Sequence, residues 1–134
     1  MYVDIVRLRM FNVGCHIQSV FLGCLLYADD MILICPSVQG LRVMLNVCVL
    51  ISSELALDFN ARKSYCIAFG KLTVKHDIEP MPLGNDNIQW VSSFKYLGVT
   101  ICGGKSLSLT LLQLKDPSLQ MPIVFLHTLR GWMN

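Results

Sequence analysis

The stretch from Leu22 to Cys35 consists of two apolar blocks separated by one polar break, Ala28-Asp29-Asp30. Each block has the length and the residue types of a buried strand, so the pattern predicts two short antiparallel strands joined at the acidic pair. An unpaired carboxylate in a low-dielectric interior costs several kcal/mol, and two neighbouring carboxylates repel each other. We therefore expect the hairpin tip to hold Asp29 and Asp30 in a cleft, beside water or a divalent cation. The alternative is a solvated surface turn, because aspartate is a favoured turn residue.

The residues from Val38 to Leu55 show the i, i+3, i+4, i+7 spacing of one helix face, and Ser37 is a suitable N-cap. Polar residues lie away from the apolar stripe, which predicts a helix packed with one face on a sheet. The stripe is formed by Leu41, Met44, Leu45, Cys48, Ile51 and Leu55, and the polar positions are Gln39, Arg42, Asn46, Ser52 and Ser53.

Other stretches predict shorter elements. The sequence from Gly14 to Ile17 indicates a short strand, and Leu57–Gly70 indicates a polar turn followed by an apolar strand. Lys71–Asn87 is rich in turn residues, so we expect a loop or a loose hairpin. Ile88–Ile101 alternates between apolar and polar residues and closes with a tight turn around Gly98. No convincing period places an element between residues 105 and 134.

The composition narrows the class of protein. With 134 residues, of which 54% are hydrophobic, the chain can form one domain with a core. Only 15% of the residues are charged, against about 25% in a typical soluble domain. Some of the surface is therefore expected to be covered by a partner or by further sequence. The formal charge of +2 is too small to indicate nucleic acid by itself.

The six cysteines are spaced by nine or more residues, which favours reduced core thiols over a zinc site or a disulfide framework. No apolar run approaches the ~20 residues that a membrane-spanning helix needs, so no membrane partner is predicted. The first ten residues lack the pattern of a signal peptide. We expect an intracellular protein, nuclear or cytoplasmic.

Tyr27-Ala28-Asp29-Asp30 between apolar strands resembles the palm hairpin of reverse transcriptases, in particular those of retrotransposons that lack long terminal repeats (LINE-type elements). Two later blocks resemble the same family in the same order: Phe59-Asn60-x-x-Lys63-Ser64 with its apolar strand, and Phe94-Lys95-Tyr96-Leu97-Gly98-Val99. The resemblance covers about residues 12–102.

This resemblance implies an α+β fold, a partial polymerase palm. Its parts would be an antiparallel β-hairpin carrying Asp-Asp, one amphipathic helix packed with it, and a hairpin like the primer grip. It makes residues 1–102 a partial palm domain and leaves residues 103–134 an unplaced tail. That tail could be a degenerate thumb, or sequence joined by splicing or a shifted frame. Gly103-Gly104-Lys105-Ser106 does not complete a phosphate-binding loop, because Val99 stands where the motif needs its first glycine.

The resemblance also implies RNA-directed DNA synthesis by two-metal nucleotidyl transfer. Asp29 would be a ligand of Mg²⁺, and Asp30 would support the metal site from beside it. Lys63 would lie near the incoming triphosphate, unless it is merely a solvated turn lysine. Tyr27 would contact nucleic acid near the primer terminus. A second set of residues would grip the primer, unless they form a plain β-hairpin: Lys95, Tyr96, Leu97 and Gly98.

The family also needs an aspartate on an earlier strand, a glycine-bearing helix and fingers, and this sequence contains none of them. We therefore expect the chain to be the rear part of an enzyme that uses an RNA template, a DNA primer and deoxynucleoside triphosphates. We expect it to be inactive without the missing N-terminal half. The alternative is a noncatalytic remnant that binds a partner protein or nucleic acid through an exposed apolar face.

Overall fold

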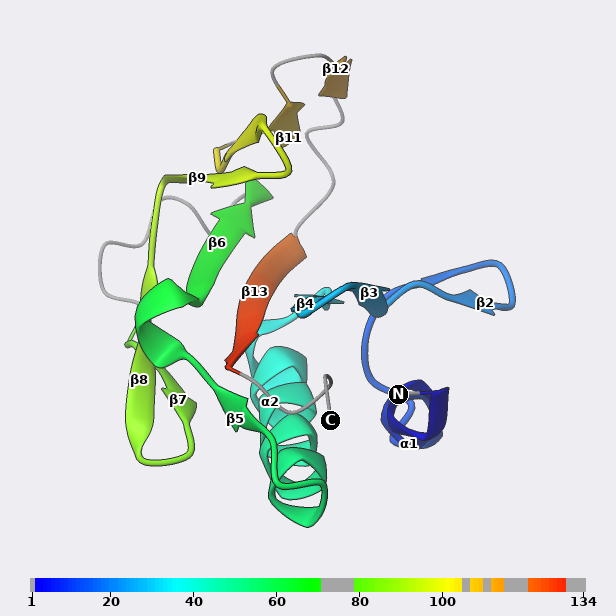
Figure 1. Ribbon diagram of the computed structural model, residues 1–134. Helices are drawn as coiled ribbons and strands as arrows, with labels where there is room; N and C mark the ends of the chain where they lie inside the picture. Colours follow the sequence, from blue (N-terminus) through cyan, green and yellow to red (C-terminus); the bar gives the residue numbers. More distant parts are fainter. Residues whose placement is uncertain (1, 71–78, 105–106, 110–111, 115–120, 130–134) are drawn as a thin grey trace.

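The structure, a computed structural model, describes residues 2–70, 79–104, 107–109, 112–114 and 121–129 (Figure 1). These residues form a mixed α+β fold with one long helix, which confirms the predicted class. The elements are α1 (Tyr2–Met10), β1 (His16–Ile17), β2 (Val20–Phe21), β3 (Cys24–Tyr27), β4 (Asp30–Ile34), α2 (Val38–Glu54), β5 (Asp58–Phe59), the 3₁₀ turn η1 (Ala61–Lys63), β6 (Tyr65–Phe69), β7 (Met81–Leu83), β8 (Asp86–Trp90), β9 (Ser93–Tyr96), β10 (Val99–Cys102), β11 (Leu107–Leu109), β12 (Leu112–Leu114) and β13 (Met121–Leu129).

The largest sheet has the strand order β3-β4-β13-β6-β8-β7, and β5 also pairs with β13. Strands β4 and β6 are each antiparallel to β13, so they run in the same direction with one strand between them. Helix α2 connects these two strands. Strand β8 is parallel to β6, so β4, β6 and β8 all begin at the same end of the sheet.

Helix α2 covers one face of this sheet. Because alternate strand residues point to opposite faces, each face of the sheet has its own set of buried side chains. Met31 and Leu33 of β4 and Cys66 of β6 are buried in the same core as the apolar stripe of α2. The opposite face carries a second buried cluster, in which Ile67 and Phe69 of β6 pack with Phe94 of β9. The β9–β10 hairpin is therefore held on the face of the sheet that α2 leaves open.

The predicted helix is confirmed as α2. The Ser37 side chain accepts a hydrogen bond from the Gly40 backbone N–H at 3.1 Å, as an N-cap does. Two details of the prediction are wrong. Leu55 lies beyond the helix and is 49% exposed. Ser52, expected on the polar side, is buried. Its burial is tolerated because its hydroxyl donates a hydrogen bond to the Val49 carbonyl at 2.8 Å, within the helix.

The predicted hairpins are present. Strands β3 and β4 pair from Cys24↔Leu33 to Tyr27↔Asp30, and β9 pairs with β10 around the turn at Gly98. The short strand predicted at residues 14–17 is β1, which forms a small separate sheet with β2. The described part of the 71–87 connector contains a hairpin, β7–β8, which begins at Met81.

Strand β13 has no counterpart in the prediction. It pairs with β4 over residues 123–127 and with β6 over residues 121–125, so it is a central strand of the main sheet. Proline normally indicates an edge strand or a strand end, and Pro122 pairs here with Ala68. Because Pro122 is the second residue of β13, its missing N–H falls at the beginning of the ladder.

Gly103 and Gly104 join the β9–β10 sheet to the main sheet. The backbone N–H of Gly70 donates to the Gly104 carbonyl at 2.7 Å, and Gly103 donates to the Ser92 carbonyl at 2.8 Å. A Cβ atom at Gly103 would lie 2.7 Å from the Ala68 carbonyl oxygen. The sequence Gly103-Gly104 thus permits a close backbone approach at this position.

The cysteines are all free thiols, and four of them are buried: Cys24, Cys35, Cys48 and Cys66. These four thus have the core position that was expected for most of the cysteines. Within the residues that the structure describes, no helix has the length and apolar character needed to cross a membrane.

Burial of Cys66 makes stability depend on pH in the alkaline range. Burial raises the pKa of the Cys66 thiol from 9.0 to about 12. The folded state therefore holds this proton more tightly than the unfolded state, so the contribution to stability is complete below pH 9 and is lost as the pH rises toward 12. The slope is about 1.4 kcal/mol per pH unit between these values. Urea unfolding of the wild type and of Cys66→Ala at a series of pH values should show this extra slope only in the wild type. Parallel slopes for the two proteins would contradict the prediction.

Candidate functional site

The acidic hairpin, β3–β4, places the carboxylates of Asp29 and Asp30 in different surroundings. Tyr27 and Asp30 are register partners, so the turn between the strands consists of Ala28 and Asp29. Ala28 has a φ of 50°, a conformation that two-residue hairpin turns require and most residues avoid. Asp29 is exposed at the tip, whereas Asp30 is half-buried as the first residue of β4. The strands are therefore joined at Ala28-Asp29, one residue earlier than the acidic pair itself.

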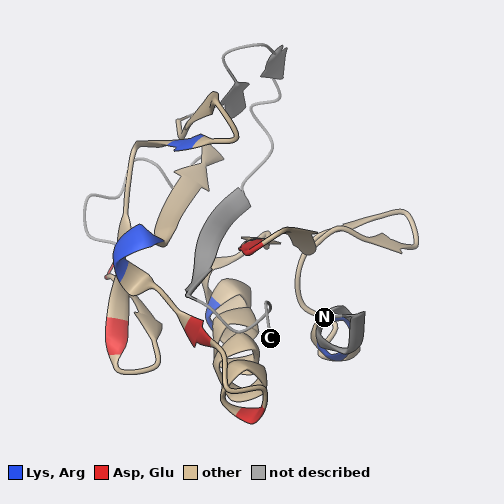
Figure 2. Cartoon of the chain, in the orientation of Figure 1, with Lys and Arg blue, Asp and Glu red and all other residues tan. Residues whose placement is uncertain are grey.

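Strand register places the other predicted elements at the same end of the sheet. Asp30 lies opposite His127 on β13, and two residues earlier on β13 Phe125 lies opposite Tyr65, the first residue of β6. Since neighbouring strands are about 4.8 Å apart, the starts of β4 and β6 are about 10 Å apart across the sheet. Lys63 lies in η1, immediately before β6, and is exposed. Figure 2 shows the acidic turn and the basic residues of η1 on separate elements.

The β9–β10 hairpin brings Tyr96 to the acidic hairpin. Burial, the charge of Asp30 and that of Tyr27 together raise the pKa of Tyr96. Tyr96 therefore lies within electrostatic reach of both residues, although they are more than sixty positions earlier in the chain. Lys95, Leu97 and Gly98 are exposed around the turn. Three predicted site residues thus gather on one face of the sheet, Tyr27, Asp30 and Tyr96, while Asp29, Lys63 and Lys95 lie on exposed turns or strand positions around them.

The described residues do not complete a magnesium site. Nowhere in the described ranges do three or more histidine, cysteine, aspartate or glutamate side chains gather closely enough to hold a metal ion. Asp29 and Asp30 supply two carboxylates, whereas Mg²⁺ requires six oxygen ligands in near-ideal octahedral geometry. Water and substrate phosphates would have to supply the other oxygens, or a further carboxylate from elsewhere.

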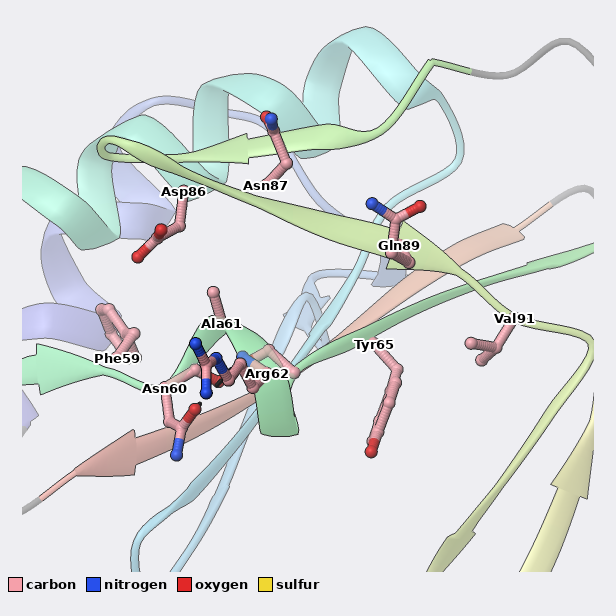
Figure 3. A pocket seen from close by; sticks show the side chains of 10 residues that line it. Phe59, Asn60, Ala61, Arg62, Tyr65, Asp86, Asn87, Gln89 and Val91 are labelled. Carbon is pink, nitrogen blue, oxygen red and sulfur yellow. Dashed lines mark hydrogen bonds between the residues drawn. The ribbon is translucent and has the colours of Figure 1, made fainter.

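A hollow of about 580 Å³ lies beside η1 and not at the acidic turn (Figure 3). Its walls come from the β5–η1–β6 segment and from β8. The lining residues are Phe59, Asn60, Ala61, Arg62, Ser64, Tyr65, Asp86, Asn87, Gln89 and Val91. This hollow is not the cleft expected around Asp29 and Asp30, because neither aspartate lines it.

The η1 wall of the hollow has a backbone fixed by its own hydrogen bonds. The Asn60 side-chain oxygen accepts from the Arg62 backbone N–H at 3.1 Å, and the hydroxyl of buried Ser64 donates to the Asn60 carbonyl at 2.7 Å. Lys63 is the basic residue that the sequence singled out in this turn, but Arg62 is the one that lines the hollow. The guanidinium of Arg62 is thus carried by a turn with a defined shape.

The opposite wall follows from the parallel pairing of β6 and β8. Tyr65 and Gln89 are register partners, so two segments more than twenty residues apart meet side by side. The Tyr65 ring is stacked on Phe94, with centroids 6.2 Å apart and an interplanar angle of 28°. Sequence reasoning missed this wall, because Asp86-Asn87 looks like an ordinary polar turn and nothing local indicates its parallel partner.

Comparison with family models, with curated proteins and with solved structures found no match to this chain.

The turn of the β9–β10 hairpin allows a test by mutation. Leu97 has a φ of 49° and Gly98 a φ of 80°, so both central residues adopt the left-handed conformation of a type I′ turn. Gly98→Ala should cost roughly 1 kcal/mol, although no heavy atom lies within 4 Å of the added Cβ, because the backbone conformation disfavours a side chain. Leu97→Asn should stabilise the protein by up to roughly 1 kcal/mol for the same reason. Thermal unfolding monitored by circular dichroism measures both changes, and a destabilising Leu97→Asn would contradict this description of the turn.

Proposed function

We propose that this chain is the palm portion of an RNA-directed DNA polymerase of the retrotransposon type, and that it is inactive without an upstream portion. The observation that carries the proposal is that Tyr96 of β9 and Ile32 of β4 pack against the same buried cluster, with Tyr96 within electrostatic reach of Tyr27 and Asp30. These residues belong to the two hairpins that resemble the acidic hairpin and the primer grip of that family. A shared active centre would require these two hairpins to lie near each other.

The proposed roles follow from position. Asp29, exposed at the hairpin tip, would bind Mg²⁺, and Asp30 would contribute from the beginning of β4. Tyr27 is 60% exposed and could contact the nucleic acid strand. Lys95, Tyr96, Leu97 and Gly98 would hold the sugar-phosphate chain of the primer over the acidic pair. Lys63, at the same end of the sheet, would neutralise charge on the incoming triphosphate.

The magnesium ions would supply activation of the primer hydroxyl and stabilisation of the leaving pyrophosphate. This chain's own contribution would be to hold the primer and to present two carboxylates. The upstream portion would add the aspartate, the template-positioning helix and the fingers that the resemblance requires. Deoxynucleoside triphosphates and an RNA template would be the substrates.

A primer-extension assay tests this function. The purified chain, with an RNA template, a DNA primer, deoxynucleoside triphosphates and Mg²⁺, should give no extension. Fusion of the upstream half of a LINE-type reverse transcriptase to its N-terminus should give extension. Asp29→Asn should then reduce the rate by at least about a hundredfold. Asp58→Asn is the matched control, since Asp58 is also exposed but lies on β5.

Two outcomes would contradict the proposal. Extension by the chain alone would show that the upstream portion is not needed. A correctly folded fusion that extends no primer, or that extends equally well with Asp29→Asn, would show that the acidic hairpin is not a polymerase centre.

A second candidate function is a noncatalytic interaction domain. Several apolar side chains are exposed where α1 ends and on the β1–β2 hairpin: Met10 (78%), Phe11 (56%), Ile17 (64%) and Val20 (58%). Exposed apolar side chains of this kind favour contact with a partner protein. If a function in cells survives the double change Asp29→Asn and Asp30→Asn but is lost with Ile17→Asp, this candidate is supported over polymerisation.

A further inference from the structure

We propose that the hollow beside η1 binds one nucleotide unit, with its phosphate at Arg62 and its base against Tyr65 and the side-chain amides of β8. The proposal does not depend on polymerase activity, because the hollow contains neither of the two aspartates. Its volume of about 580 Å³ lies within the range of ligand sites, about 300–1,000 Å³.

The polar groups of the hollow match a nucleobase. Asn87 and Gln89 are two residues apart on β8, both exposed, and both line the hollow. A side-chain amide offers a donor and an acceptor together, and the edges of nucleobases present the same mixture. A ligand that offers only acceptors, such as a simple carboxylate or phosphate, would use only half of this capacity.

The aromatic wall provides a surface for stacking. Tyr65 is half-buried, and its stacking on Phe94 fixes the ring plane. A fixed ring loses little freedom when a base stacks on it. Gln89, the register partner of Tyr65, is a second polar residue of the same lining, on the β8 side of the hollow.

The charges divide the hollow into a phosphate side and a base side. Arg62 and Asp86 are the charged residues of the lining, and they come from η1 and from the start of β8 (Figure 3). An exposed guanidinium is a bidentate phosphate donor. The Asp86 carboxylate repels phosphate but accepts from an exocyclic amino group, as acidic side chains do with cytosine. We therefore expect cytosine to bind more tightly than thymine.

The nucleotide unit could belong to a free nucleotide or to a single strand, and binding measurements separate these sources. Fluorescence anisotropy of labelled oligo(dC) and oligo(dT), with cytidine monophosphate as competitor, measures both. Oligo(dC) should bind more tightly than oligo(dT). Competition by cytidine monophosphate would show that a free nucleotide is a sufficient ligand. A lack of competition would restrict the site to single strands. Both outcomes support a nucleotide site, whereas binding of neither ligand would overturn it.

Two variants separate the phosphate contact from the base contact. Arg62→Gln should weaken oligo(dC) binding about tenfold and reduce the slope of log affinity against log salt by about 0.7, as expected for one lost phosphate contact on a single strand. Gln89→Ala should weaken binding severalfold without changing this slope. If circular dichroism shows that Gln89→Ala has not folded, Asn87→Ala replaces it, because Asn87 pairs with Pro82 of β7 whereas Gln89 pairs with Tyr65 of the central β6.

Arg9→Gln is the matched control, since it removes the same charge from an exposed arginine on α1. It should leave both the affinity and the slope unchanged. If Arg62→Gln and the β8 variant both bind like the wild type, or if Arg9→Gln weakens binding as much as Arg62→Gln, the proposal is wrong.

Discussion

A chain that lacks residues 121–134 is expected to lose its cooperative folded state. Strand β13 supplies the partner of both β4 and β6, so its removal leaves two unpaired edges in the middle of the main sheet. The remaining pairs, β3–β4 and β6–β8–β7, would be joined only through α2. Unpaired edges of this kind promote aggregation. Size-exclusion chromatography and urea unfolding of the truncated chain measure the loss.

A single substitution in β13 and a synthetic β13 peptide test whether the loss of folding is due to this strand. Val124→Pro removes one donor where Val124 pairs with Leu33 and Cys66, so it should have nearly the effect of the truncation. Ile17→Pro, in the separate and exposed β1–β2 sheet, should cost far less. A synthetic peptide with the sequence of residues 119–131 should restore folding of the truncated chain. A monomeric truncated chain with an unchanged unfolding transition would contradict the central position of β13.

Phe69→Ala is expected to cost about 3–5 kcal/mol and to disturb the candidate site. Phe69 is 1% exposed, in the cluster that holds Phe94 of β9 against the sheet. Removing the ring leaves a cavity under the β9–β10 hairpin, so Tyr96 should move away from Asp30. The raised pKa of Tyr96 should then fall toward its ordinary value of 10.0. Guanidinium unfolding measures the first effect, and ultraviolet titration against a Tyr96→Phe reference measures the second.

Leu45→Ala is the control for this experiment. Leu45 is fully buried on α2, on the other face of the sheet, and its truncation should cost about 2–5 kcal/mol. The hairpin that carries Tyr96 should stay in place, so the pKa of Tyr96 should not change. If both variants lower this pKa equally, the second cluster does not position the hairpin.

Local patterns predicted those elements whose residues need no distant partner. The period of α2 and the cap at Ser37 are properties of one stretch, and the acidic break between two strands defines the β3–β4 hairpin. Ser52 was placed wrongly because its hydroxyl bonds within the helix, which allows a polar residue to be buried. No local pattern indicated that the hairpins of Tyr27 and Tyr96 lie near each other.

Elements that depend on long-range pairing could not be predicted in this way. Strand β13 pairs with β4 and β6, which precede it by more than fifty residues, so no local pattern reveals its partners. In addition, a proline such as Pro122 normally indicates that a segment is not a central strand. The hollow was missed for a similar reason. Its two walls meet through the parallel pair β6–β8, and its polar residues look like solvated turns when each wall is considered alone.

The central position of β13 also affects synthesis of the protein. Roughly fifty residues separate the end of β6 from the beginning of β13. At a translation rate of roughly 5–20 residues per second, several seconds pass between the appearance of these two strands. During that time the apolar edges of β4 and β6 have no strand to separate them. We therefore expect the nascent chain to be most prone to aggregation in this interval, and slower translation of residues 70–120 would lengthen it.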